Sequence, residues 1–153
     1  LQVDEEYLNI FGRRYHLVEP YRCDDAELVL VTSGTVSSTA RDVIDRYRDE
    51  GKEMGMLKIR TFRPFPSEEI RKALQGVSKL AVIDRNISYG MGGIFAEEMK
   101  SVFCNEKVRP TVFSFIAGLG GRDITQQTIS NVIEYTLEQD QPKAEILWPD
   151  LRR

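Results

Sequence analysis

The sequence is poor in the side chains that build metal centres. Its 153 residues include only two cysteines, Cys23 and Cys104, and one histidine, His16. An iron–sulfur cluster normally takes about four thiolates and a zinc site needs clustered Cys and His ligands, so we expect this chain to bind no metal. Because the cysteines form no CxxC pair, two reduced thiols are expected, with a single disulfide between them as the alternative.

Familiar catalytic and nucleotide-binding motifs are also missing. Asp123 stands where a GxGxxG motif starting at Gly118 needs its third glycine, and no GxxxxGK[ST] motif occurs. Ser33 lacks the GxSxG context of a hydrolase nucleophile, and one distant histidine does not favour a serine triad. The residues alone therefore provide no complete catalytic set.

Strong net charge and long apolar runs are absent as well. A net charge of −3 does not supply the basic face that general nucleic-acid binding requires. No apolar run approaches the ~20 residues of a membrane-spanning helix, and no signal peptide is recognisable. These features predict a cytoplasmic protein with neither a nucleic-acid nor a membrane partner.

What is present is an alternation of strand and helix patterns that predicts an α/β fold. Residues 1–14 indicate a helical turn or a linker, and Tyr15–Arg22, interrupted by Pro20, indicates an edge strand or an extended arm. Helical patterns follow four further predicted strands: Ala26–Ser33, Met56–Phe62, Lys79–Ile83 and Thr111–Ala117. Such alternation is typical of a mainly parallel sheet with helices on both faces.

Local signals predict where several helices begin and end. Gly51 occupies the position of a helix C′ glycine, and Ser67 and Thr125 are suitable N-caps. Ile124 and Ile129 have the spacing of a hydrophobic staple around Thr125.

Three loops at the carboxyl ends of predicted parallel strands form the candidate site. They are Thr32–Thr39, Asp84–Gly93 and Gly118–Thr125, and each precedes a helix N-terminus, where free backbone N–H groups attract anions. An anion or phosphate site is one interpretation, and tight turns that need glycine for packing are the other. The candidate ligand or interface residues are Thr32, Ser33, Gly34, Thr35, Asp84, Arg85, Asn86, Gly90, Gly92, Gly93, Gly118, Gly120, Gly121, Arg122 and Asp123.

Adjacent opposite charges in these loops allow two interpretations. Asp84 with Arg85, and Arg122 with Asp123, can form local ion pairs that fix the shape of the loop. Alternatively, each arginine is presented to a carboxylate or phosphate, for which its planar fork is suited. A domain that builds a crevice without catalytic groups often completes a site that belongs to another chain.

Three segments together resemble one family. Lys58–Pro66 (KIRTFRPFP), Ala81–Gly93 (AVIDRNISYGMGG) and Gly118–Thr125 (GLGGRDIT) are similar, in order and spacing, to the C-terminal region of the alpha chain of 2-oxoacid:ferredoxin oxidoreductases. The pyruvate:ferredoxin oxidoreductases, also called pyruvate synthases, are the branch that these segments resemble most. The resemblance covers roughly residues 10–138.

The resemblance implies a three-layer α/β/α fold like the transketolase C-terminal domain. Its five-stranded mixed sheet has the order 1-3-2-4-5, with Tyr15–Arg22 as the antiparallel first strand. Accordingly, we expect a lead-in segment at 1–14, the domain at 15–138 and a polar tail at 139–153. Trp148 in that tail is expected to pack on the body of the domain or on a partner.

The resemblance also implies the chemistry of the complete enzyme, which decarboxylates pyruvate oxidatively to acetyl-CoA and CO₂ and reduces ferredoxin. Thiamine pyrophosphate, Mg and [4Fe–4S] clusters would lie in the preceding thiamine-binding domain of the alpha chain, in the beta chain and in the delta chain, and these chains together with the gamma chain would be the partners. This chain, an isolated domain or a split subunit, is then expected to bind no cofactor, to be inactive alone and to serve in assembly. The family's loops map onto Asp84, Arg85, Gly92, Gly93, Gly120, Gly121, Arg122 and Asp123 as interdomain or intersubunit contacts.

Two alternatives remain open. The domain can belong to an oxidoreductase for another 2-oxoacid, such as 2-oxoglutarate or a branched-chain oxoacid, or it can be a stand-alone module that binds an anion or coenzyme A. An exposed apolar patch at Phe62, Phe65 or Trp148 favours the subunit interpretation, because such patches mark lost partners. A pocket at the Asp84–Gly93 loop that holds phosphate favours the module.

Overall fold

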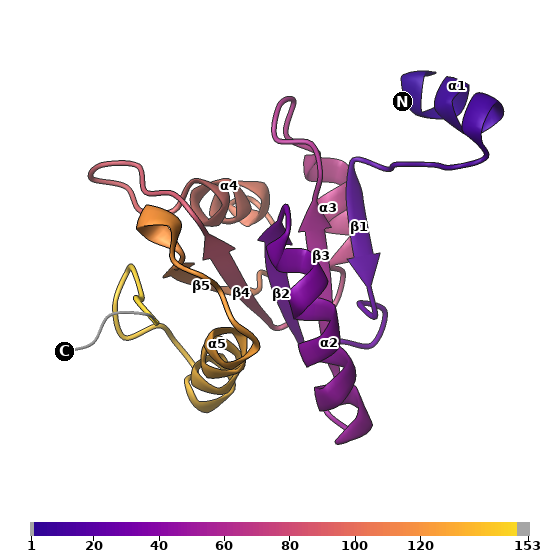
Figure 1. Ribbon diagram of the computed structural model, residues 1–153. Coiled ribbons are helices and arrows are strands. Elements are labelled where there is room, and N and C mark those ends of the chain that lie inside the picture. The colour runs from indigo at the N-terminus through magenta and orange to yellow at the C-terminus, as the bar shows by residue number, and fades with distance from the viewer. Residues whose placement is uncertain (1, 150–153) are drawn as a thin grey trace.

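Five strands form one mixed sheet in the order β1-β3-β2-β4-β5 (Figure 1). The structure is a computed structural model that describes residues 2–149. β1 runs antiparallel to β3, and all other neighbouring strands are parallel, which confirms the expected topology. The strands are β1 Val18–Tyr21, β2 Leu28–Ser33, β3 Met54–Ile59, β4 Lys79–Asp84 and β5 Thr111–Ile116.

Helices cover both faces of this sheet, as predicted. One core cluster joins the sheet to α2 (Val36–Asp49) and α5 (Gln126–Glu138), and a second joins it to α3 (Ser67–Ala73) and α4 (Ile94–Phe103). The central strands are therefore buried on both faces, which explains the continuous apolar runs in β2 and β4. The remaining helix, α1 (Gln2–Phe11), lies apart from these layers (Figure 1).

The strand predicted at Met56–Phe62 is displaced in the structure, where β3 spans Met54–Ile59. Its partner β2 ends at Ser33, which pairs with the last residue of β3, so no parallel neighbour is available beyond that point. The backbone N–H groups of residues 60 and 61 both donate to the carbonyl of Leu17 instead. The availability of a neighbour, and not the alternation of side chains, sets the end of this strand.

Two of the three predicted helix-end signals are confirmed. Gly51 follows α2 with a left-handed φ of +80°, and the Thr125 hydroxyl accepts a hydrogen bond from the N–H of Thr128 at 3.2 Å. The N-cap predicted at Ser67 is wrong: Ser67 is the first helical residue of α3, and Pro66 precedes it without a side-chain cap. The carbonyl of Pro66 already accepts the first helical hydrogen bond.

Candidate functional site

The carboxyl ends of β2, β4 and β5 meet at one edge of the sheet and bring the three predicted loops together. The first is shorter than predicted, because Thr32 and Ser33 still belong to β2 and α2 begins at Val36. Only Gly34, with φ of +63°, and Thr35 connect the two elements. The hydroxyls of Thr32 and Ser37 lie 2.9 Å apart and are buried, so these two polar side chains satisfy each other.

The second loop also directs its acid into the protein. The fully buried carboxylate of Asp84 accepts hydrogen bonds from the N–H groups of Phe95 at 2.9 Å and Ala96 at 3.0 Å. The N–H of Ile94 donates to Oδ1 of Asn86 at 3.2 Å. These are donors of the first turn of α4 that would otherwise lack helical partners. The anion at this helix N-terminus is therefore a residue of the chain itself, and Asp84 caps α4 rather than pairing with Arg85.

Gly93 makes this cap possible by close approach. A Cβ built on Gly93 would lie 2.2 Å from Oδ2 of Asp84, far inside any allowed contact. Its backbone, with φ of −75°, is otherwise open to any residue. Only glycine leaves room for the carboxylate at this position.

The burial of Asp84 has an electrostatic cost. Removal from water raises the pKa of its carboxyl, while the backbone hydrogen bonds from Phe95 and Ala96 act in the opposite direction. The nearby Glu97 adds to the increase. The carboxyl thus serves the helix cap in an environment that favours its protonated form more than water does.

The tip of the same loop projects outward as a tight turn. Ser88 and Gly92 form an antiparallel bridge, with Ser88 N–H donating to the Gly92 carbonyl at 2.7 Å. The positive φ angles of Gly90 and Gly92 allow this reversal. At the tip, Tyr89 is 97% exposed and Met91 57% exposed. Two large side chains are therefore displayed by a backbone that is itself well ordered by hydrogen bonds.

The third loop forms an open turn next to Arg85. Gly118, Gly120 and Gly121 all have left-handed φ angles, and this turn lines a pocket of about 490 Å³ together with Arg122 and Trp148. A Cβ on Gly118 would lie 3.1 Å from Nε of Arg85. Asp123 is exposed just beyond the turn.

Arg85 is an exposed cation at this edge. Its side chain is exposed, and within residues 2–149 its guanidinium has no hydrogen bond or ion pair. The local ion pair considered for Asp84 and Arg85 does not form, because the carboxylate faces α4 while the guanidinium lies over the Gly118 turn. Arg85 therefore keeps its bidentate capacity for a group outside this chain.

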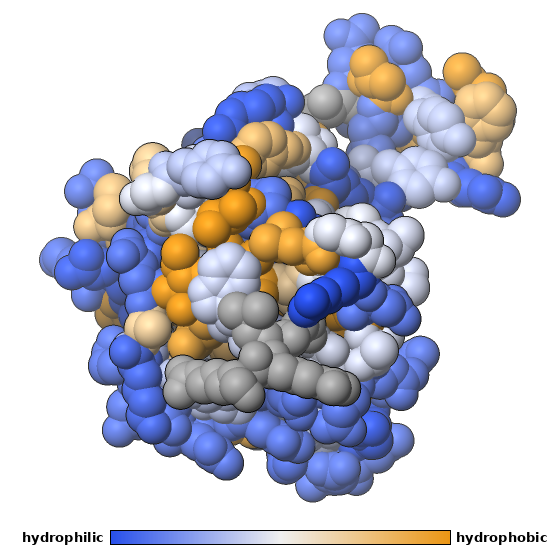
Figure 2. All heavy atoms as spheres, turned by 60° about the vertical axis from the view of Figure 1, so that its left-hand side comes forward, coloured by the Kyte–Doolittle hydropathy of each residue, from blue (hydrophilic) through white to orange (hydrophobic). Residues whose placement is uncertain are grey.

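The C-terminal tail adds apolar surface to the same edge. Leu147 extends the sheet beyond β5, donating to the Ser114 carbonyl at 2.8 Å and accepting from the Ile116 N–H at 2.9 Å. Ile146 lies against Gly92, and Trp148, still 38% exposed, lines the pocket. Apolar side chains gather on this side of the molecule in Figure 2. Trp148 thus packs partly on the body, as predicted, and partly faces solvent.

The apolar patch considered at Phe62 and Phe65 is covered by contacts within the chain. The Phe62 ring packs against the rings of Phe65 and Phe95 at centroid distances of 6.1 and 5.2 Å. The guanidinium of Arg63 lies 3.9 Å from the Phe62 centroid and is paired with Glu98. This aromatic group stabilises the start of α3 and α4 and offers little free apolar surface.

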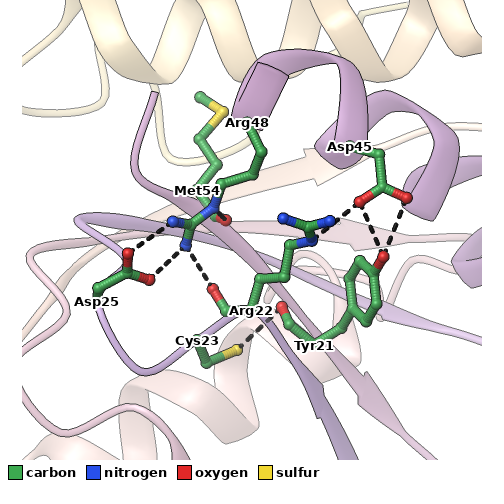
Figure 3. A network of polar contacts seen from close by, with 7 residues as sticks. All are labelled: Tyr21, Arg22, Cys23, Asp25, Asp45, Arg48 and Met54. Carbon is green, nitrogen blue, oxygen red and sulfur yellow. Dashed lines mark hydrogen bonds and ion pairs between the residues drawn. The ribbon is translucent and has the colours of Figure 1, made fainter. Parts of the chain in front are cut away.

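The turn between β1 and β2 carries a polar network of a different kind (Figure 3). Arg48 donates to both carboxylate oxygens of Asp25, at 2.7 and 2.6 Å, and to the carbonyls of Arg22 and Met54. The network holds α2 to this turn. Burial raises the pKa of the adjacent Cys23 thiol to about 11, so the thiol stays protonated and unreactive at neutral pH.

Two signals at the candidate edge were not used in the sequence interpretation. The apolar run Ile146–Trp148 inside a polar tail marks the segment that returns to β5. The Asp84/Asn86 spacing ahead of α4 marks a two-residue cap, but the donors follow eight to twelve residues later and local spacing does not reveal them.

Among residues 2–149, no three or more His, Cys, Asp or Glu side chains are placed to hold a metal ion. Both cysteines are free thiols. None of the helices in this part of the chain is long and apolar enough to cross a membrane.

Comparison with known proteins identifies relatives. Residues 26–129 match the family described as pyruvate:ferredoxin oxidoreductase core domain II. The chain is 45% identical over 147 residues to pyruvate synthase subunit PorA of Methanothermobacter thermautotrophicus, covering 96% of this chain and 37% of that protein. It is 37% identical over 155 residues to ketoisovalerate oxidoreductase subunit VorA of Pyrococcus horikoshii, covering 99% and 39%. The chain thus spans less than two fifths of the length of these curated relatives.

Solved structures share the fold. A 2-oxoglutarate:ferredoxin oxidoreductase from Magnetococcus marinus aligns with a TM-score of 0.58 and 16% identity, over 87% of this chain and 21% of that chain. A split-gene transketolase aligns with a TM-score of 0.63 and 10% identity, over 85% of this chain and 46% of that chain. At these identities the similarity establishes the transketolase-like α/β architecture alone.

Proposed function

Because this chain belongs to the pyruvate:ferredoxin oxidoreductase core domain II family, we propose that it is this domain of a pyruvate synthase alpha subunit. Its role there is to assemble domains and subunits, and the catalytic groups lie elsewhere. The observation that carries the proposal is the division of polar groups at the carboxyl edge. The Asp84 carboxylate accepts hydrogen bonds from the first turn of α4, whereas Arg85 is exposed and unpaired within residues 2–149.

The complete enzyme would convert pyruvate and coenzyme A to acetyl-CoA and CO₂ in the cytoplasm and pass the electrons to ferredoxin. Thiamine pyrophosphate with Mg and [4Fe–4S] clusters would supply the decarboxylation and electron-transfer chemistry. We place these groups outside this domain, because residues 2–149 offer neither the four cysteine thiolates of an iron–sulfur cluster nor three His, Cys, Asp or Glu side chains placed to hold a metal ion. No step of the reaction is therefore assigned to a side chain of this domain.

The carboxyl edge has the composition of a protein interface. Aromatic residues, Met and Arg are enriched at interface cores, and Tyr89, Met91, Trp148 and Arg85 belong to these types. In the Gly118–Gly121 turn, Gly120 and Gly121 are exposed. An arginine among such side chains pairs best with a carboxylate that a partner brings into the same dry environment. The partner surface that fits is therefore apolar and carries at least one acidic side chain.

A second candidate substrate follows from the relatives. The similarity to a ketoisovalerate oxidoreductase subunit favours a branched-chain 2-oxoacid as the alternative to pyruvate. An assembly domain without substrate contacts would serve both enzymes equally well. The assay must therefore include both oxoacids.

The test is reconstitution of the enzyme. The full-length subunit that contains this domain is mixed with the remaining oxidoreductase subunits, and co-purification and viologen reduction are measured with pyruvate, 2-oxoisovalerate or 2-oxoglutarate. Stable co-purification, with pyruvate-dependent activity that requires this subunit, is expected. Failure to associate, combined with saturable binding of coenzyme A or inorganic phosphate to the subunit, would overturn the proposal in favour of a binding module.

A further inference from the structure

Helix α1 presents an apolar stripe that stays largely exposed in the described structure. Val3, Tyr7, Ile10 and Phe11 recur at helical spacing and are 75, 38, 71 and 59% exposed. No residue of α1 is buried. The opposite side of the helix carries Glu5 and Asn9, so the helix has one apolar and one polar side.

The helix is nevertheless held in a defined place. Asp4 accepts a hydrogen bond from the N–H of Tyr15 at 2.7 Å and pairs with Arg14 at 3.4 Å. The ring of Tyr15 packs edge-on against Tyr7 at 5.5 Å and lies under the guanidinium of Arg60 at 5.0 Å. Through Tyr15 and Arg60 these contacts tie α1 to the residue that follows β3, while the helix itself lies apart from the layers of the sheet (Figure 1).

Such a helix needs a second surface to be stable. Isolated helices shorter than about 12 residues are marginal in water, and most helical stability comes from packing an apolar face. Four large apolar side chains at a helical period, all solvent-exposed, are also a recognised mark of an interaction site.

The size of the stripe indicates what covers it. At these exposures the four side chains offer on the order of 500 Å², less than the roughly 800 Å² per partner of a stable interface between separate molecules. A smaller contact suffices when both surfaces belong to one chain. The linkage keeps the two surfaces at a high effective concentration, so a weak contact still forms. The relatives align across nearly the whole of this chain, yet this chain covers only 37–39% of their length.

We propose that α1 is a docking helix whose apolar stripe packs against the part of the full-length subunit that lies outside these 153 residues. This inference rests on the proposed function, since it assumes that the domain belongs to a longer subunit. α1 precedes the first strand of the sheet and has no buried residue, so it is suited to join the domain to its neighbour. The cover that fits is an apolar groove of the same chain.

Cysteine accessibility in the full-length subunit tests the proposal. Ile10→Cys places a thiol in the stripe, and Asn9→Cys places one on the polar side of the same turn. In the isolated full-length subunit at low micromolar concentration, we expect maleimide to label the Ile10→Cys thiol at least tenfold more slowly than the Asn9→Cys thiol. Equal labelling of the two thiols would overturn the proposal. So would protection that appears only at high protein concentration, which indicates a second copy, or only after the other subunits are added.

A matched pair of aspartates provides a second measurement. Ile10→Asp should raise the hydrogen-exchange rate of the α1 amides at least tenfold in the full-length subunit, and Asn9→Asp should change it less than twofold. Amides of β2 and β4 report whether the domain remains folded. If the unmodified enzyme showed no pyruvate-dependent activity, the proposed function would be contradicted, but the ratio of the two maleimide labelling rates would not change. Failure of the proposed function and failure of the docking proposal are therefore distinguishable.

Discussion

The β4–α4 and β5–α5 loops are both glycine-rich turns ahead of a helix, yet their glycines serve different purposes. Gly93 has an ordinary φ and is required because the Asp84 carboxylate occupies the space of its side chain. Gly120 has a left-handed φ of +66° and open space around it. The first loop therefore directs its polar groups inward and stabilises a helix, whereas the second exposes its backbone beside a pocket.

The largest effect is expected where the packing is closest. Gly93→Ala forces the Asp84 side chain out of the α4 cap, so overpacking and lost hydrogen bonds should together reduce the free energy of unfolding by about 3–5 kcal/mol. Gly120→Ala meets no neighbouring atom and should cost about 1–2 kcal/mol, because only the backbone is strained. Urea denaturation of both variants measures the difference, and equal costs would contradict the distinction between the two loops.

Asp84→Ala removes the acceptor itself and should cost about 2–4 kcal/mol, since two helix N–H groups lose their partner. Burial raises the pKa of Asp84, so the folded protein holds this proton to a higher pH than the unfolded chain does. The stability that the proton contributes is fully present below the unfolded pKa, near 3.9, and is lost as pH rises through the folded value.

The advantage of the unmodified protein over Asp84→Ala should therefore shrink as the pH is raised above about 4. Denaturation curves of both proteins at several pH values between 4 and 7 test this sign. An advantage that grows with pH would show that the hydrogen bonds to the carboxylate outweigh its burial.

A smaller effect should separate two other helix starts. Thr125 caps α5 through its hydroxyl, so Thr125→Ala should cost about 1 kcal/mol. Thr35 occupies the corresponding position of α2 without a side-chain hydrogen bond, and Thr35→Ala should change stability by less than about 0.5 kcal/mol. Thermal denaturation of the two variants in parallel is sufficient, and a reversed order would refute the assigned caps.

The smallest effect on folding is expected at Arg85. Its exposed guanidinium has no partner within residues 2–149, so Arg85→Ala should leave the free energy of unfolding within about 0.5 kcal/mol. Urea denaturation tests this, and a loss above 1 kcal/mol would indicate a structural role for this residue.

Much of the architecture was accessible from sequence. The apolar runs in Ala26–Ser33 and Lys79–Ile83 predicted buried parallel strands, which the structure has at Leu28–Ser33 and Lys79–Asp84, and the family resemblance supplied the strand order. The extent of β3 was not accessible, because it depends on where a neighbouring strand ends. Residues 2–11 form a whole helix where only a helical turn or a linker was predicted, although its apolar spacing was visible in the sequence.

The sequence predicted where the loops of the candidate site meet, but not the directions in which their side chains point. The three loops do meet at one sheet edge, which follows from parallel strands. The adjacent charges of Asp84 and Arg85 suggested a pair, whereas the structure points them in different directions. The cap of α4 depends on atoms eight to twelve residues apart, and short-range patterns do not contain that information. The ligand or interface role of the loop residues stays a prediction.

The central claim is that the carboxyl edge, and Arg85 within it, binds another part of the oxidoreductase. The most direct measurement is the dissociation constant between the full-length subunit and the remaining subunits for two charge reversals, Arg85→Glu and Lys107→Glu. Lys107 is an exposed cation in the α4–β5 loop, at the opposite edge of the sheet. Reversing a paired interface charge should weaken binding at least tenfold for Arg85→Glu, and Lys107→Glu should change it less than twofold. Equal effects of the two reversals, or unchanged binding by Arg85→Glu, would contradict the account.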